Sequence, residues 1–144
     1  MDKILIVVDM QNDFLTGSLA NESAVKVIPN IIKEFESKEY SNIIFTRDTH
    51  CGENYLSTQE GKQLPLLHCV KNSKGWEICD ELSSSVLSLG VPFSVVDKPT
   101  FGFNGWRDTI LSDIVKEDTE IVFVGTCTDI CVVSNALIIK AFCI

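Results

Sequence analysis

The chain has 144 residues, 45% of them hydrophobic and 22% charged, with a formal net charge of −8. This length predicts one domain, residues 1–144, with a core large enough to need no disulfide bonds. The acidic balance argues against nucleic-acid and anionic-membrane partners, because both bind through a basic surface.

Four short apolar runs predict the strands of a sheet. β-Branched residues are frequent in residues 4–8, 43–46, 93–96 and 121–124, a composition typical of strands buried on both faces. Apolar residues at helical spacing predict helices over 29–38, with Pro29 in the first turn, over 76–87 and over 106–116. This alternation predicts an α/β fold with a doubly wound, Rossmann-like, mostly parallel sheet flanked by helices.

The sequence shows no pattern of a targeting or membrane segment. The apolar run at the amino terminus is too short for a signal peptide, and no run approaches the roughly 18 residues of a spanning helix. We therefore expect a cytoplasmic protein. The six cysteines include no Cys-x-x-Cys pair, so free and mostly buried thiols are expected.

Reactive side chains follow each of the four predicted strands. Ligands gather at the carboxyl ends of the strands in open parallel sheets, so residues placed there can share one site. The residues in these places are Asp9 after the first strand, Asp48 and His50 after the second, Lys98 after the third and Cys131 shortly after the fourth.

Cys131 is the candidate nucleophile. It follows a tight turn at Gly125 and opens an apolar helix, where the helix dipole and free N–H groups lower a thiol pKa below its free value of about 8.5. The same N–H groups can bind an oxyanion. The alternative is a buried thiol that only fills space.

Asp9 and Lys98 are candidates for the groups that activate this thiol. A buried carboxylate has a raised pKa and can act as a base, whereas the alternative role for Asp9 is to cap a turn. Lys98 is braced by Pro99 and can point inward, where it would stabilise a thiolate and an ionised Asp9 together. The alternative for Lys98 is a solvated surface lysine.

The irregular segment 48–73 holds both histidines of the chain. Asp48 and His50 are two residues apart, on one side of an extended segment, and His68 is the second histidine. Mixed histidine and carboxylate ligands suit Zn²⁺, Fe²⁺ or Mn²⁺. The alternative is two histidines with structural roles.

Four motifs occur in a fixed order along nearly the whole chain: Asp-Met-Gln-Asn-Asp-Phe at 9–14, Thr-Arg-Asp-Thr-His at 46–50, Lys-Pro-Thr-Phe at 98–101 and Gly-Thr-Cys-Thr-Asp-Ile-Cys-Val at 125–132. This pattern resembles the nicotinamidase/isochorismatase-like cysteine hydrolases, in their nicotinamidase branch. The resemblance implies an isochorismatase-like fold and a catalytic triad of Asp9, Lys98 and Cys131. It also implies a cis peptide between Thr126 and Cys127, and an oxyanion hole formed by the backbone N–H groups of Cys127 and Cys131.

The same resemblance implies a bound divalent metal, with Zn or Fe as the first candidates and Mn as the next. Its ligands would be Asp48, His50 and His68. Glu60 is a weaker fourth ligand, and Glu53 competes with it for that place.

The implied reaction is hydrolysis of the carboxamide of nicotinamide, or of a close aromatic amide, through a cysteine thioester. Phe14 is a candidate wall for a flat ring, with a plain core position as its alternative, and Thr126 and Cys127 are expected to contact the substrate. The alternative functions are an isochorismatase-like hydrolase of another small substrate and an inactive truncated homologue.

Two features depart from the family pattern. Nicotinamidases often carry an aromatic residue just before the His-Cys pair, whereas this chain has Leu-Pro-Leu-Leu at 64–67. The sequence also ends soon after the predicted nucleophile helix, without the C-terminal βα unit that the family usually adds. In a strand order of 3-2-1-4 the fourth strand is then an exposed edge, so we expect a homo-oligomer that buries residues 121–124.

Overall fold

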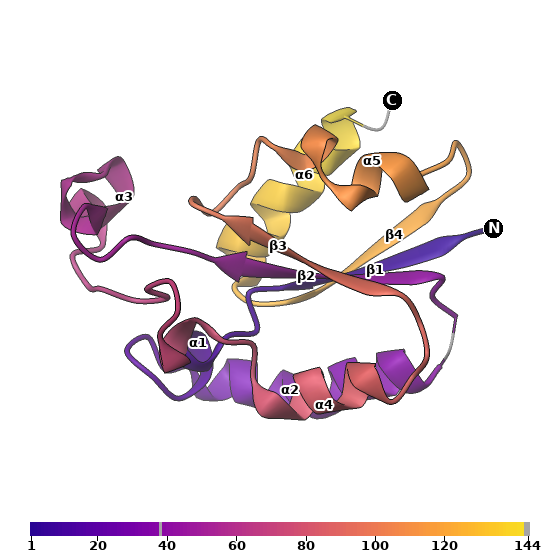
Figure 1. Ribbon diagram of the computed structural model, residues 1–144, viewed down its shortest axis with the longest axis horizontal. Coiled ribbons are helices and arrows are strands. Elements are labelled where there is room, and N and C mark those ends of the chain that lie inside the picture. The colour runs from indigo at the N-terminus through magenta and orange to yellow at the C-terminus, as the bar shows by residue number, and fades with distance from the viewer. Residues whose placement is uncertain (38, 143–144) are drawn as a thin grey trace.

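A computed structural model describes residues 1–37 and 39–142, and within these residues four parallel strands form one sheet. The strand order is β3-β2-β1-β4, as expected, and every pairing is parallel (Figure 1). The strands are β1 Lys3–Val8, β2 Asn42–Asp48, β3 Phe93–Lys98 and β4 Glu120–Gly125. Each strand is longer than predicted, so Asp48 and Lys98 are the last residues of their strands and do not follow them.

Helices cover both faces of the sheet. Figure 1 shows α2 (Glu22–Glu36) and α4 (Asp80–Leu87) on one face, with α5 (Ile110–Ile114) and α6 (Val133–Phe142) on the other. Two shorter helices, α1 (Asn12–Leu15) and α3 (Gln59–Gln63), lie near the carboxyl end of β2. The doubly wound α/β architecture is therefore confirmed.

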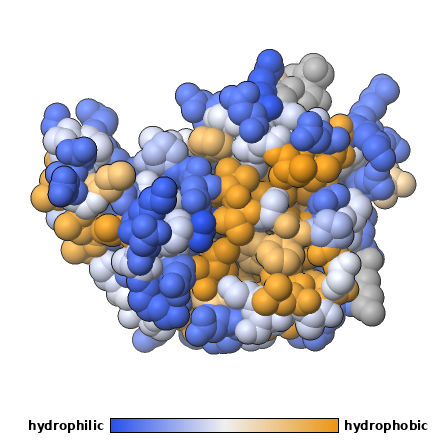
Figure 2. Space-filling view, viewed as in Figure 1, coloured by the Kyte–Doolittle hydropathy of each residue, from blue (hydrophilic) through white to orange (hydrophobic). Residues whose placement is uncertain are grey.

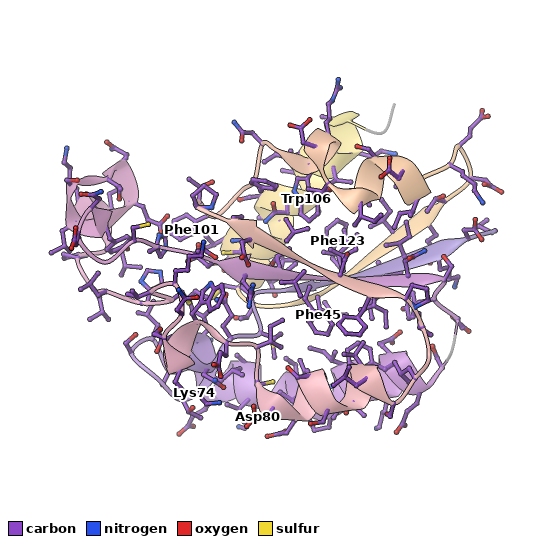
Figure 3. All side chains as sticks on the ribbon, viewed as in Figure 1. Phe45, Lys74, Asp80, Phe101, Trp106 and Phe123 are labelled. Carbon is purple, nitrogen blue, oxygen red and sulfur yellow. The ribbon has the colours of Figure 1, made fainter. Side chains whose placement is uncertain are left out.

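The core is divided by the sheet into two apolar clusters. Leu5 and Val7 of β1 belong to the cluster under α2 and α4, and Ile4, Ile6 and Val8 belong to the cluster under α5 and α6. All five side chains are fully buried, which is why the β1 sequence is continuously apolar. Figure 3 shows the larger side chains on the two sides: Phe45 on the first, Phe123 and Trp106 on the second.

The prediction for the start of the first helix is wrong, and its predicted end at Lys38 lies outside the described residues. Helix α2 begins at Glu22, because the Asn21 side chain caps it by accepting a hydrogen bond from Ser23 N at 3.0 Å. Pro29 lies inside the helix and not in its first turn. The buried face runs through Ala24, Ile28, Ile31 and Phe35, so packing against the sheet outweighs the hydrogen bond that proline removes.

The other two predicted helices are each split. The segment predicted at 76–87 is a 3₁₀ turn over Lys74–Trp76 followed by α4, and the segment predicted at 106–116 is a 3₁₀ turn over Trp106–Asp108 followed by α5. In the second case Thr109 accepts a hydrogen bond from Leu111 N at 3.2 Å, which caps a new helix start. The segment 48–73 is likewise not wholly irregular, because it contains a 3₁₀ turn over Tyr55–Ser57 and helix α3.

The edge strand β3 exposes apolar side chains. Phe93 and Val95 are 43% and 40% exposed, and Figure 2 shows the apolar surface on this side of the molecule. Strand β4 forms the opposite edge of the sheet within the described residues, as expected from the strand order. Of the helices that the structure describes, none is both long enough and apolar enough to cross a membrane.

Gly125 closes β4 against β1 in a conformation that favours glycine. Its φ is +121°, and a Cβ placed there would collide with the backbone of Val8, including the carbonyl oxygen. This close contact sets the start of the turn that leads from β4 to Cys131.

We predict that Gly125→Ala lowers the free energy of unfolding by about 3 kcal/mol or more, because strain at positive φ adds to the steric collision. Gly90→Ala is the matched control: Gly90 also has positive φ, +70°, but open space surrounds its Cα. Its cost is about 1 kcal/mol, from the backbone alone. Denaturant unfolding measures both, and equal losses would contradict the steric argument.

Candidate active site

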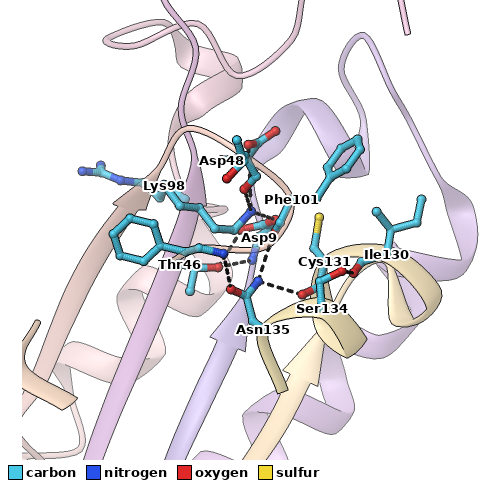
Figure 4. A network of polar contacts seen from close by, with 12 residues as sticks. Asp9, Thr46, Asp48, Lys98, Phe101, Ile130, Cys131, Ser134 and Asn135 are labelled. Carbon is cyan, nitrogen blue, oxygen red and sulfur yellow. Dashed lines mark hydrogen bonds and ion pairs between the residues drawn. The ribbon is translucent and has the colours of Figure 1, made fainter. Parts of the chain in front are cut away.

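Asp9 and Lys98 form a buried ion pair at the carboxyl ends of β1 and β3. Lys98 Nζ lies 2.7 Å from Asp9 Oδ2, and neither side chain is exposed to solvent. Thr46 of β2 donates its hydroxyl to Asp9 Oδ1 at 2.6 Å (Figure 4). Asp9 itself has a positive φ of 51°, in the left-handed region that few non-glycine residues adopt. The strand ends therefore bring together two of the three predicted catalytic side chains.

Burial and mutual charge both act on this pair. Burial raises the pKa of Asp9, against the opposing charge of Lys98. Burial by itself would lower the pKa of Lys98, but the charge of Asp9 outweighs that effect and raises the pKa. Lys98 thus remains a cation, and Asp9 is a stronger base than an ordinary carboxylate.

Cys131 lies beside this pair, on a π-helical turn over Thr128–Val132 that continues directly into α6. The thiol is close enough to Asp9 and Lys98 for both charges to act on its pKa. We expected the helix start to lower the pKa of Cys131, and the structure contradicts this. Burial and the negative charge of Asp9 raise the pKa, and Lys98 only partly opposes them. The thiol therefore needs a base to become a nucleophile.

A cavity of about 210 Å³ opens beside the thiol. The predicted substrate-contacting residues Phe14, Thr126 and Cys127 all line it together with Cys131. The peptide bond between Thr126 and Cys127 is cis, as expected. Across the residues that the structure describes, the Cys127 N–H donates to no acceptor, so it is available to a bound molecule.

Next to the cavity, the structure gathers the four predicted metal ligands Asp48, His50, Glu60 and His68. One ligand atom from each lies within 4.8 Å of all the others. Asp48 Oδ2 is 2.9 Å from His50 Nε2 and 3.2 Å from His68 Nε2, and Glu60 Oε1 is 3.4 Å from His50 Nε2. Glu53 is exposed and outside this group, so the geometry favours Glu60 over Glu53.

The chemistry of this group fits a divalent cation. Asp48 Oδ1 and Glu60 Oε1 are buried without a hydrogen-bond partner among the described residues. The Nδ1 atom of His68 lies 2.8 Å from the Leu66 carbonyl, which fixes the ring so that Nε2 faces the carboxylates. Backbone contacts of this kind orient the histidine ligands of many metal sites.

The charges of the group are strongly coupled. Burial by itself would raise the pKa of Asp48, but hydrogen bonds with His50 and His68 outweigh it and lower the pKa. Burial opposes protonation of His50, yet its contacts with Asp48 and Glu60 raise the pKa of His50 to about 9. The carboxylates of Asp48 and Glu60 therefore favour a positive charge between them. A bound metal ion would supply that charge in place of the proton on His50.

Two buried polar residues of the site were not predicted from the sequence. Thr46 holds Asp9, as described above. Gln11 donates through Nε2 to the carbonyls of Asp48 and Trp76 and accepts from Asp48 N through Oε1, each at 2.8 Å. The available signals were a polar threonine inside an apolar strand and a glutamine in the polar segment that follows the first buried strand.

We predict that Lys98→Met lowers the free energy of unfolding by about 3–5 kcal/mol, because it leaves Asp9 buried without a counter-charge. Adding Asp9→Asn to this variant should recover part of the loss, since the uncompensated charge is then gone. The control is Lys116→Met, which removes an exposed ion pair with Asp2 and should leave the midpoint unchanged. A strictly additive double variant would contradict a coupled pair.

The chain is similar to known proteins along nearly its whole length. The model of the isochorismatase domain family matches residues 3–141. The nicotinamidase of Schizosaccharomyces pombe is 28% identical over 92% of this chain and 74% of its own length.

Solved structures show the same fold. The N-carbamoylsarcosine amidase of Thermoplasma acidophilum is 28% identical, with a TM-score of 0.72 over 95% of this chain and 75% of that one. The pyrazinamidase of Pyrococcus horikoshii in complex with zinc is 29% identical, with a TM-score of 0.63 over 95% of this chain and 77% of that one. The chain therefore belongs to the isochorismatase domain family and is a hydrolase of that family.

Proposed function

We propose that this chain hydrolyses the carboxamide of nicotinamide, or of a close neutral aromatic amide, to the acid and ammonia. The observation that carries the proposal is the buried ion pair of Asp9 and Lys98 beside a buried thiol, Cys131, that lines a small apolar cavity. The nicotinamidase names of the sequence relatives support the amide as substrate class.

The proposed reaction uses Cys131 as a covalent nucleophile. Asp9 takes the thiol proton, and the thiolate attacks the carboxamide carbon to form a C–S bond. The developing oxyanion accepts hydrogen bonds from the backbone N–H groups of Cys127 and Cys131. Asp9 then returns its proton to the departing ammonia, which breaks the C–N bond and leaves a thioester.

Hydrolysis of the thioester completes the cycle. Asp9 takes a proton from an attacking water, whose oxygen forms a bond to the carbonyl carbon. The C–S bond then breaks, and Asp9 passes the proton to the departing sulfur, which releases the acid and restores the Cys131 thiol. Lys98 keeps its charge throughout and stabilises Asp9 in its ionised form. The raised pKa of Asp9 suits proton transfer in both directions. It makes the carboxylate basic enough to take the thiol proton, and the protonated form can still give that proton to ammonia.

The cavity favours a neutral, flat substrate. Phe14 and Phe101 line it from two elements, and none of the described lining residues is a lysine or an arginine. A carboxylate-bearing substrate would therefore meet no lysine or arginine side chain in the cavity lining. The segment 64–67, Leu-Pro-Leu-Leu, provides no aromatic side chain to the cavity, but Phe101 does.

We propose Zn or Fe as the metal, held by Asp48, His50, Glu60 and His68. A bound divalent ion would act as a Lewis acid and offer a coordination position to the ring nitrogen of the substrate. His68 supports this arrangement because it belongs to the metal-ligand group and also lines the cavity.

The test of the proposed function is ammonia release from nicotinamide by the metal-supplemented protein. We predict that Cys131→Ala lowers the rate by about 10³-fold or more, because the covalent path is lost. Cys51→Ala is the matched control and should keep the native rate, since this free thiol is exposed and is not a cavity-lining residue. No ammonia from the native protein, or equal rates in the native protein and Cys131→Ala, would overturn the proposal.

A separate prediction concerns the metal. Glu60→Gln should weaken Zn²⁺ affinity by about 10–100-fold, whereas Glu53→Gln should leave it unchanged. Titration against a chelating dye, together with elemental analysis, measures both without any turnover. A protein that binds no divalent ion, or equal losses in the two variants, would contradict this assignment.

A further inference from the structure

Asn135 is a fully buried amide on α6, four residues after Cys131. All of its hydrogen-bonding positions have partners in other parts of the site region. Its Nδ2 donates to the carbonyls of Cys131 at 2.7 Å and Phe101 at 2.9 Å. Its Oδ1 accepts from Phe103 N at 2.9 Å and Trp106 Nε1 at 3.0 Å.

These four bonds join the nucleophile turn to the loop that follows β3. Lys98 ends β3, and its Nζ donates to the Thr100 carbonyl at 3.1 Å within that same loop. Phe101, two residues after Pro99, is a wall of the cavity. Figure 4 shows the Asn135 side chain between the Cys131 turn and this loop. One side chain therefore sets the distance between the thiol, the cavity wall and the lysine-bearing strand end.

We propose that Asn135 is a positioning residue for the reaction: its Nδ2 group holds the Cys131 carbonyl and thereby the orientation of the thiol toward Asp9 and the cavity. The proposal rests on the proposed function in taking Cys131 as the nucleophile. Asn135 lines no part of the cavity, so it acts through Cys131 and not by touching substrate. A displacement of about 1 Å at a reacting atom can cost about 100-fold in rate, which is the scale of effect expected here.

The neighbouring residue shows how a smaller side chain could keep one of these bonds. Ser134 donates its hydroxyl to the carbonyl of Ile130, four residues earlier in the same helical segment. A serine at position 135 can make the equivalent bond to the Cys131 carbonyl, whereas an alanine cannot. Asn135→Ser and Asn135→Ala therefore form a matched pair that differs by a single donor.

The test measures kcat and KM for nicotinamide with the metal-loaded protein, well below the melting temperature of each variant. Asn135→Ala should lower kcat by about 10–100-fold with KM changed by less than about three-fold, and Asn135→Ser should recover at least about five-fold of that loss. Ile139→Ala is the control for helix packing. Ile139 is buried one turn farther along α6, in the same apolar cluster as Cys131, and does not line the cavity beside the thiol. It should lower the melting temperature and leave kcat within about two-fold of native.

Alkylation by iodoacetamide, followed by peptide mass spectrometry, tests the positioning separately from the substrate. The rate of Cys131 labelling should fall by at least about five-fold in Asn135→Ala and recover in Asn135→Ser. Equal kcat in the two Asn135 variants, a similar kcat loss in Ile139→Ala, or unchanged or faster Cys131 labelling in Asn135→Ala would overturn the proposal. If the native protein releases no ammonia but the labelling follows the predicted order, the proposed substrate fails and the positioning role stands.

Discussion

The ion pair between Asp9 and Lys98 is expensive to bury, because each charge loses its hydration when the strand ends close around it. Two features stabilise the pair. The parallel strands β1 and β3 place Asp9 and Lys98 at the same edge of the sheet, and the Thr46 hydroxyl donates a hydrogen bond to the second carboxylate oxygen of Asp9. The rest of the site depends on this pair. Burial makes Asp9 a stronger base, and the charge of Asp9 adds to burial in raising the pKa of the adjacent thiol, while Lys98 opposes both shifts.

Much of this arrangement could be predicted from the sequence, because the signals were local. Buried strands appear as β-branched runs, and the rule that ligands gather at strand ends places Asp9, Lys98 and Cys131 at one edge. Helix limits were less predictable, since side-chain caps such as Asn21 and Thr109 compete with apolar periodicity. The direction of the Cys131 pKa shift was missed because burial and the position of Asp9 are tertiary properties.

Two of the residues that sequence reasoning missed share one physical character. Gln11 and Asn135 use side-chain amides to bind backbone groups that are more than 30 residues away along the chain, as well as nearer ones. No periodicity or motif in the sequence predicts such contacts, because they depend on where loops meet in three dimensions. His68 illustrates a related point. The sequence predicted it as a metal ligand, but only the structure shows that it also lines the cavity. The metal group and the cavity are thus one continuous region.

The position of β3 has a consequence for how this site is lost on heating. Strand β3 pairs only with β2 among the described residues, and its outer side chains Phe93 and Val95 are exposed, whereas β1 is enclosed on both sides. Edge elements open locally at lower free energy than the centre of a sheet. The positive charge of the ion pair is thus carried by an edge strand and the base by a central strand. Local opening of β3 would move Lys98 away from Asp9 and Cys131 while the rest of the fold remains intact. Without that positive charge the thiolate of Cys131 would be harder to form.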